Sequence, residues 1–139
     1  GALSLLKNLK SESQHCGLHG LAHPGVKRVI VPPEDDIFYV GYLKKCKQIL
    51  EKHNALLITD EIQTGLGRTG KLLCSEYEGV RPDIVLLGKA LSGGFYPISA
   101  TLCDDHIMNL IKPGEHGSTY GGNPLAAQTA IASLDVILE

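Results

Sequence analysis

Residues 55–61 read ALLITDE and residues 82–89 read PDIVLLGK, and these two stretches decide the fold. Each contains a short, continuous apolar run that stops at charged residues, Asp60 and Glu61 in the first and Lys89 in the second. A strand that is covered on both faces, as in a parallel sheet, has this pattern. Both runs are therefore predicted to be central strands of an α/β sheet.

Strand and helix patterns alternate around these two runs. Further strands are predicted at residues 29–31, which lead into two prolines, and at residues 97–103. The helices are predicted from apolar spacing and from capping residues, at residues 2–10, 37–53 (capped by Asp35 or Asp36), 104–111 and 124–139. Strands that alternate with helices favour the α/β class.

Composition limits the size of the protein and its partners. A chain of 139 residues is enough for one compact domain, and 43% hydrophobic with 20% charged residues is ordinary for a globular protein. A net charge of −2 gives no sign of a nucleic-acid partner, and no apolar run is long enough to span a membrane. The four cysteines show no paired spacing, which favours free thiols in a reducing intracellular compartment.

The two central strands bring a carboxylate and an amine to one edge of the predicted sheet. Ligands of open α/β sheets bind beyond the carboxyl ends of the strands, where Asp60 and Lys89 are expected. Gly88 and residues 92–94 (SGG) are small and would let a flat ligand approach the backbone. A lysine in a partly desolvated pocket can act as an amine nucleophile. A plain salt bridge between Asp60 and Lys89 explains the pair equally well.

Two stretches resemble other kinds of site. Residues 65–71 (GLGRTGK) fit the first seven positions of a phosphate-binding P-loop, but Leu72 stands where that motif needs a hydroxyl, and residues 61–64 separate the loop from the strand. A P-loop ATPase is therefore disfavoured. Residues 15–23 hold three histidines and a cysteine at loosely metal-like spacing, yet no second ligand pair follows, so no metal site is predicted.

Three stretches carry a resemblance to a known family. Residues 57–70 (LITDEIQTGLGRTG) and 81–94 (RPDIVLLGKALSGG) resemble the class III pyridoxal-phosphate (PLP) aminotransferases. Residues 111–125 (IKPGEHGSTYGGNPL) are similar to the branch of that family that acts on ornithine. The resemblance implies that residues 29–139 are part of the large PLP-binding domain of a fold-type I aminotransferase, with a mostly parallel sheet flanked by helices. Residues 1–28 are unassigned.

The same resemblance implies a role for individual residues. Lys89 would hold PLP covalently and then move the proton between substrate and cofactor. Asp60 would pair with the pyridine nitrogen, and Gln63 would face the phenolic oxygen of the ring. Thr119, with Ser118 beside it, would reach the cofactor phosphate of a neighbouring subunit. Glu61 is expected to be structural, because its side chain should point away from Asp60 on an extended segment.

The implied reaction transfers the δ-amino group of L-ornithine to a 2-oxo acid, giving glutamate semialdehyde, which cyclises to pyrroline carboxylate, and an amino acid. This places the protein in proline biosynthesis and arginine metabolism, as a homodimer or higher homo-oligomer in the cytoplasm or the mitochondrial matrix. Acetylornithine and 4-aminobutyrate stay open as alternative substrates. The family's phosphate-binding turn, ring-stacking aromatic residue and C-terminal domain have no counterpart in these residues. The isolated chain is therefore also interpreted as a non-catalytic fragment that self-associates.

Overall fold

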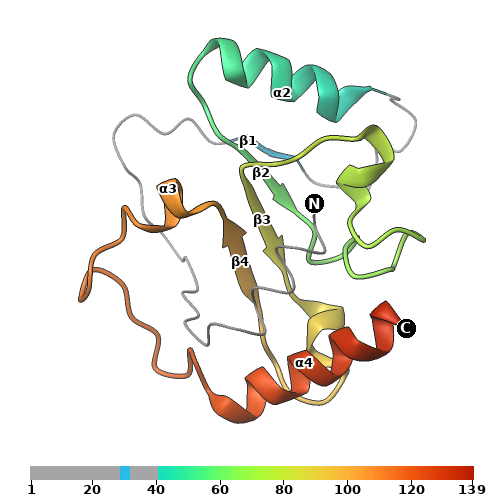
Figure 1. Cartoon of the computed structure of the whole chain (residues 1–139), viewed down its shortest axis with the longest axis vertical. Coiled ribbons are helices and arrows are strands. Elements are labelled where there is room, and N and C mark those ends of the chain that lie inside the picture. The colour runs from blue at the N-terminus through green and yellow to red at the C-terminus, as the bar shows by residue number, and fades with distance from the viewer. Residues whose placement is uncertain (1–28, 32–40) are drawn as a thin grey trace.

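The computed structural model describes residues 29–31 and 41–139, and these residues form one mixed sheet with helices around it (Figure 1). The strands lie side by side in sequence order: β1 (Val29–Val31), β2 (Leu57–Asp60), β3 (Ile84–Leu87) and β4 (Ala100–Cys103). The β1–β2 and β2–β3 pairs are parallel, and the β3–β4 pair is antiparallel. The predicted α/β class with a mostly parallel sheet is confirmed.

The central strands form where the apolar runs predicted them. β3 covers the predicted run, whereas β2 starts two residues into its run, at Leu57, and continues to Asp60. Leu57 and Leu87 are completely buried, as expected of strands covered on both faces. The strand predicted at residues 97–103 begins only at Ala100. Pro97 has no backbone N–H to donate, and Leu87, the last residue of β3, pairs with Ala100.

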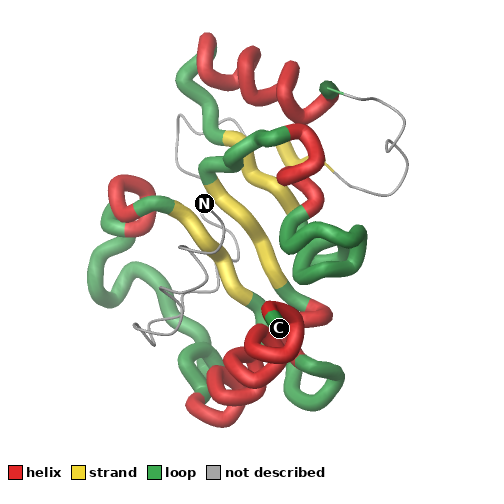
Figure 2. The backbone as a smooth tube through the Cα atoms, turned by 45° about the vertical axis from the view of Figure 1, so that its right-hand side comes forward, coloured by secondary structure: helices red, strands yellow, loops and turns green. Residues whose placement is uncertain are grey.

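The helices lie at the two ends of the sheet (Figures 1 and 2). α2 (Tyr42–Lys52) starts after Gly41, which has a φ of 87°, and the proposed caps Asp35 and Asp36 lie outside the described residues, as does the helix predicted at residues 2–10. α3 (Asp105–Met108) is shorter than predicted, because the chain continues to Ile111 as single turns. Two short 3₁₀ helices follow β2 and β3, η1 (Cys74–Glu78) and η2 (Lys89–Ser92).

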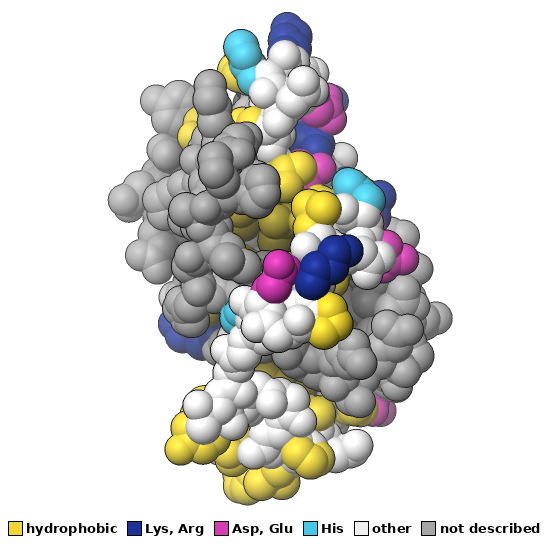
Figure 3. All heavy atoms as spheres, turned by 90° about the vertical axis from the view of Figure 1, so that its left-hand side faces the viewer, with side chains coloured by type: hydrophobic (Ala, Val, Ile, Leu, Met, Phe, Trp, Pro, Cys, Tyr) yellow, Lys and Arg dark blue, Asp and Glu magenta, His cyan; other side chains and the backbone are white. Residues whose placement is uncertain are grey.

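α4 (Pro124–Leu138) is the longest helix and packs on η2. It begins as predicted with proline in its first turn, and the Asn123 side chain caps it by accepting from the backbone N–H groups of Leu125 at 2.9 Å and Ala126 at 3.3 Å. Three large apolar side chains of α4 stay exposed, Leu125, Val136 and Leu138, and a space-filling view shows apolar side chains in yellow at the lower end of the molecule (Figure 3). Among the described helices, none has the length and apolarity that a bilayer crossing requires.

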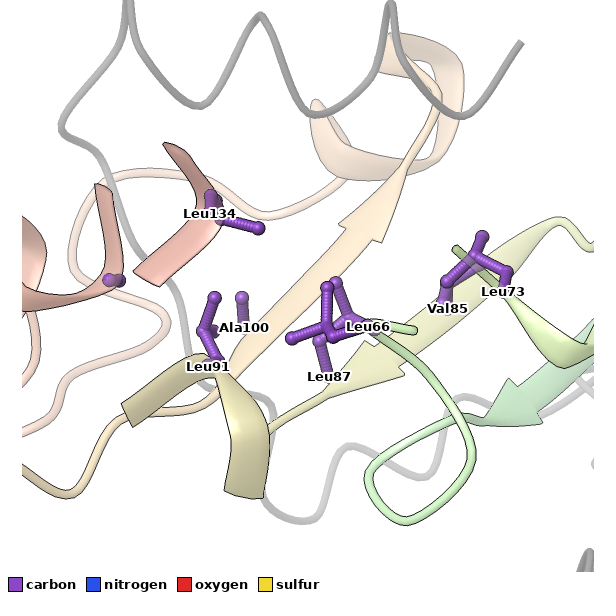
Figure 4. Close-up of a cluster of buried hydrophobic side chains, with 8 residues drawn as sticks. Leu66, Leu73, Val85, Leu87, Leu91, Ala100 and Leu134 are labelled. Carbon is purple, nitrogen blue, oxygen red and sulfur yellow. The ribbon is translucent and has the colours of Figure 1, made fainter. Parts of the chain in front are cut away.

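The main core lies between the sheet, the loop after β2, η2 and α4 (Figure 4). Its buried members come from all four of these parts of the chain: Leu66, Leu73, Val85, Leu87, Leu91, Ala100, Ala130 and Leu134. Leu87 is the last residue of β3 and Leu91 lies in η2, so the core fixes the chain on both sides of Lys89. Packing of this kind positions the backbone at the candidate site.

Asp83 connects α2 to the two central strands, which gives a stability prediction. Its carboxylate accepts from Lys47 Nζ at 2.7 Å through both oxygens, and from the backbone N–H of Leu57 at 2.7 Å. The Lys47 and Asp83 side chains are only 21% and 23% exposed. Asp83→Ala is therefore expected to lower the free energy of unfolding by about 2 kcal/mol, as measured by chemical denaturation.

The control for this variant is Asp104→Ala. Asp104 also forms an ion pair, with Arg81 Nη2 at 2.6 Å, but its side chain is 43% exposed and that of Arg81 is 68% exposed. Exposed pairs of this kind contribute little because water screens them, so the control is expected to cost less than about 1 kcal/mol. Equal losses in the two variants would show that the buried contacts of Asp83 add no stability.

Candidate active site

The register of the sheet brings Asp60 and Lys89 to the same edge. Asp60 is the last residue of β2 and pairs with Leu86 of the parallel strand β3. Lys89 follows the end of β3 after a single residue, Gly88. Both side chains therefore start at the carboxyl ends of adjacent parallel strands, where ligands of α/β sheets bind.

The Lys89 side chain contacts Gln63 and makes no salt bridge with Asp60. Lys89 Nζ donates a hydrogen bond to Gln63 Oε1, and no ion pair among the described residues includes Lys89. Asp60 instead accepts through Oδ1 from the backbone N–H of Ile62 at 3.0 Å. The simple salt-bridge interpretation of the Asp60–Lys89 pair is therefore wrong, and Lys89 is not neutralised by Asp60.

The backbone of Lys89 adopts a conformation that side chains rarely take. Its φ is +48°, in the left-handed region that favours glycine and costs other residues about 1 kcal/mol or more. Two hydrogen bonds stabilise the turn: the Ser92 hydroxyl donates to the Lys89 carbonyl at 2.7 Å, and the Leu91 N–H donates to the Gly88 carbonyl at 3.0 Å. A strained residue that the surrounding structure holds in place is common at functional sites.

Lys89 is more open than the sequence suggested. A partly desolvated pocket was expected, but the described residues leave the Lys89 side chain exposed. Gly93 and Gly94 follow η2 with positive φ, and a side chain added at Gly94 would meet no atom within 4 Å. Because the Lys89 side chain is exposed, its amine is accessible to an incoming carbonyl group, but no low-polarity pocket surrounds it among the described residues.

Ser118 and Thr119 lie on a separate, exposed loop between α3 and α4. Ser118 Oγ accepts from the Gly121 N–H at 3.0 Å, and among the described residues no hydrogen bond joins either residue to Asp60, Gln63 or Lys89. The structure therefore does not bring these two hydroxyls into the group around Lys89. Their predicted role toward a neighbouring subunit requires no such contact and stays a prediction.

Glu61 has the structural position that the sequence indicated. It is 3% exposed, and its carboxylate accepts from Thr64 Oγ1 at 2.7 Å and from the N–H groups of Cys74 at 3.0 Å and Ser75 at 2.8 Å. These bonds fix the start of η1 against the turn after β2. Sequence reasoning found the orientation of Glu61 but not these partners, two of which, Cys74 and Ser75, are far away along the chain.

The glycine-rich loop of residues 65–71 does not form a phosphate cradle. Leu66 is buried in the main core, and Lys71 Nζ donates to the Glu76 carbonyl at 3.2 Å and lies 4.7 Å from the centre of the Tyr77 ring. A P-loop lysine would instead reach over its own loop toward the phosphates. The loop also starts after a turn and not at a strand end, so the structure gives the ATPase interpretation no support.

Three of the four cysteines lie within the described residues, and the stretch with metal-like spacing lies outside them. Cys46, Cys74 and Cys103 are free thiols, as predicted, and Cys16 lies outside the described residues. Burial raises the pKa of Cys74 and of Cys103, so neither thiol is activated. The histidines of residues 15–23 also lie outside the described residues, and within the described part of the chain no three metal-binding side chains come together.

The residues at this edge fit a cofactor that carries an aldehyde and a pyridine ring. Such a cofactor needs an accessible amine, a carboxylate for the ring nitrogen and polar contacts at the ring edge. Lys89 is exposed, Asp60 is half-buried and keeps one carboxylate oxygen without a described hydrogen bond, and Gln63 lies against Lys89. Gly94, which follows η2, faces open space.

Comparison with known proteins identifies the class. Residues 19–139 match the Aminotransferase class-III family, so the chain belongs to the class III aminotransferases, a family of PLP-dependent transferases. The probable mitochondrial ornithine aminotransferase of Caenorhabditis elegans is 66% identical over 99 residues, which cover 71% of this chain and 24% of that relative. The chain therefore spans about a quarter of the length of this curated relative.

Solved structures agree with this assignment. The ornithine aminotransferase of Plasmodium yoelii superimposes with a TM-score of 0.70 at 60% identity, over 72% of this chain and 27% of that protein. The acetylornithine aminotransferase of Elizabethkingia anophelis gives a TM-score of 0.70 at 57% identity, over 72% of this chain and 25% of that protein. The predicted fold, part of a fold-type I aminotransferase, is confirmed.

Proposed function

We propose that the chain is the lysine-bearing part of an ornithine aminotransferase. The reaction moves the δ-amino group of L-ornithine to a 2-oxo acid, and the products are glutamate semialdehyde, which cyclises to pyrroline carboxylate, and an amino acid. The observation that carries the proposal is the exposed Lys89 amine in contact with Gln63, at the same sheet edge as Asp60. Relatives named as ornithine aminotransferases support the choice of substrate.

The residues of the site have separate proposed roles. Lys89 would hold the cofactor through its amine, and once that amine is free it would carry the proton from the substrate carbon to the cofactor. Asp60 pairs with the ring nitrogen and keeps it protonated, and Gln63 contacts the phenolic oxygen. PLP, when bound, supplies an electron sink for the deprotonated substrate carbon. Residues 29–139 are thus part of the large cofactor-binding domain.

The proposed assembly is a homodimer or a higher homo-oligomer. Ser118 and Thr119 are exposed and have no described hydrogen bond to Asp60, Gln63 or Lys89, and Ser118 Oγ only accepts, from the Gly121 N–H, so its O–H donor would be available to a site on a second copy. There both hydroxyls would donate to the cofactor phosphate. An intracellular compartment is proposed because the worm relative is named as a mitochondrial protein. Small-molecule substrates, and neither nucleic acid nor membrane, are the proposed partners.

Transfer of an acetylornithine amino group is the second candidate. The Elizabethkingia structure, named as an acetylornithine aminotransferase, matches this chain nearly as well as the Plasmodium structure does. Both substrates carry a terminal amine on the same carbon skeleton, and the acetyl group only blocks the α-amine. Lys89, Asp60 and Gln63 therefore do not determine which of the two substrates is preferred.

A substrate comparison tests the proposed reaction. The full-length protein, loaded with PLP, is expected to turn over L-ornithine with 2-oxoglutarate at least about tenfold faster, as kcat/KM, than acetylornithine or 4-aminobutyrate. Formation of pyrroline carboxylate and glutamate is the measurement. Preference for acetylornithine or 4-aminobutyrate would reject ornithine as the substrate but keep the transaminase chemistry, whereas no transfer from any of the three amines would reject both.

A further inference from the structure

A buried carboxylate next to the site has no cationic partner among the described residues. The Glu61 side chain is held only by neutral donors, the Thr64 hydroxyl and the N–H groups of Cys74 and Ser75. Removing a carboxylate from water is costly unless it is fully hydrogen-bonded. Its three hydrogen bonds, all between 2.7 and 3.0 Å, offset that cost and make Glu61 a rigid point in the fold.

Glu61 fixes the turn of residues 61–65 from both ends. Its backbone N–H donates to the Leu86 carbonyl of β3 at 2.9 Å, and its carbonyl accepts from the Gly65 N–H at 2.8 Å. Its side chain then binds Thr64, near the end of the turn, and the start of η1. The turn is thus attached to the sheet, to itself and to a separate helix through one residue.

Close packing removes the remaining freedom of this turn. A Cβ atom placed on Gly65 would lie 2.7 Å from the Glu61 carbonyl oxygen and 3.2 Å from Leu87 Cδ2. Only glycine fits there, because both neighbours belong to the rigid part of the structure: the backbone of the turn and a fully buried core residue. Close packing therefore restricts the turn to one position beside the end of β3.

Gln63 lies in the middle of this turn, and among the described residues only Lys89 forms a hydrogen bond with its side chain. Its side chain is exposed, and its one described hydrogen bond is the one that it accepts from Lys89 Nζ. The position of Gln63 Oε1 is therefore set by the turn, and the turn is set by Glu61. This chain of contacts connects a buried carboxylate to the amine of the site without direct contact between the two.

We propose that Glu61 is a positioning residue of the site: it holds Gln63 where the Gln63 amide oxygen restrains the Lys89 amine. Any effect of Glu61 on catalysis rests on the proposed function, whereas the coupling from Glu61 to Lys89 exists in the protein without cofactor. The Lys89 amine is restrained through its hydrogen bond to Gln63 Oε1, and the backbone of Gln63 is restrained by the turn. Loss of the Glu61 contacts loosens Gln63 and frees the amine.

The experiment measures how fast each lysine reacts with acetic anhydride in the cofactor-free, full-length protein, by mass spectrometry of its peptides. The readout is the acetylation rate of Lys89 relative to Lys112, which lies on the far loop and donates to the Asn109 carbonyl. Gln63→Ala is expected to raise this ratio about fivefold, because the amine loses a charge-assisted hydrogen bond. Glu61→Gln, which replaces one acceptor oxygen by a donor, is expected to give a similar rise.

The double variant separates positioning from general loosening. If Glu61 acts through Gln63, Glu61→Gln in the Gln63→Ala background raises the ratio no further. Thr64→Val removes one of the three bonds to Glu61 with little change in shape, and an increase of about twofold is expected. It keeps the test valid if Glu61→Gln does not fold. Glu51→Gln, the same change on the outer face of α2, is the control and should leave the ratio unchanged.

Three results would overturn the proposal. The first is an unchanged or lower Lys89 ratio in the folded Glu61→Gln protein, and the second is the same result in Thr64→Val when only that variant folds. The third is that the effects of Glu61→Gln and Gln63→Ala multiply in the double variant. If Glu61→Gln lowers thermal stability but leaves the Lys89 ratio unchanged, the first of these results holds, and Glu61 has a purely structural role. The assay contains no cofactor or substrate. Failure of the proposed transaminase function would therefore leave this result intact, and the two can be distinguished.

Discussion

In the full-length protein, Lys89→Ala is expected to abolish covalent capture of PLP. The wild-type protein should show a visible absorption band with PLP, and borohydride should fix the cofactor to the peptide that contains Lys89. Lys89 carries the exposed amine at the carboxyl ends of β2 and β3, so its removal leaves no amine at that edge among the described residues. Loss of the proton transfer alone should cost about 10²–10⁴ in kcat.

Lys71→Ala is the matched control for this prediction. Lys71 is also an exposed lysine, in the glycine-rich loop after β2, but its amine is directed to the Glu76 carbonyl and the Tyr77 ring. Capture of PLP should persist in this variant. Capture that survives loss of Lys89 would remove the basis of the proposed function, and nucleotide binding that depends on Lys71 would revive the P-loop alternative.

The positions of the strands could be predicted because burial and sequence pattern agree there. The run of residues 84–87 is apolar throughout, and it forms a strand with both faces covered. The carboxyl ends of β2 and β3 then follow from the pattern, and with them the shared edge of Asp60 and Lys89. These features are local, so a single sequence contains the information that sets them.

The features of the site that the sequence did not predict are those that depend on distant residues. Glu61 binds Cys74 and Ser75 across a loop, and no periodicity connects these positions. The positive φ of Lys89 was also hidden, because sequence rules place glycine at such positions. The proposed function requires an amine at this position, and the Ser92 hydrogen bond and the packing of η2 offset the cost of the strained conformation.

The partly desolvated pocket expected around Lys89 is absent among the described residues for a related reason. The sequence places small residues around the lysine, and small residues permit either a closed pocket or an open edge. The described residues form an open edge, since a Cβ atom added at Gly94 would meet no atom within 4 Å and the Lys89 side chain is exposed. Residues that close over a lysine must come from other parts of a protein, and their presence cannot be read from the residues beside it.

Residues 1–139 alone are expected to self-associate and to bind PLP weakly. Large apolar side chains are exposed on several elements, with Phe95 at 76%, Tyr120 at 79% and Val136 at 73%. β4 pairs only with β3 among the described residues, so its other edge offers unpaired backbone groups. Exposed apolar surface and an open edge both favour association. PLP bound at the open Lys89 edge would bury little of its surface, so weak binding is expected.

Size-exclusion chromatography combined with an absorbance titration of PLP measures both parts of this prediction. Val136→Lys is expected to increase the monomer fraction, because it removes an exposed apolar side chain from α4. Ala132→Lys adds the same charge at an exposed position of the same helix without removing a large apolar group, so it should have a smaller effect. A single monomeric peak that binds one PLP tightly would contradict the prediction. It would show that the Lys89 edge is a complete site within these residues and needs neither a second copy nor further chain.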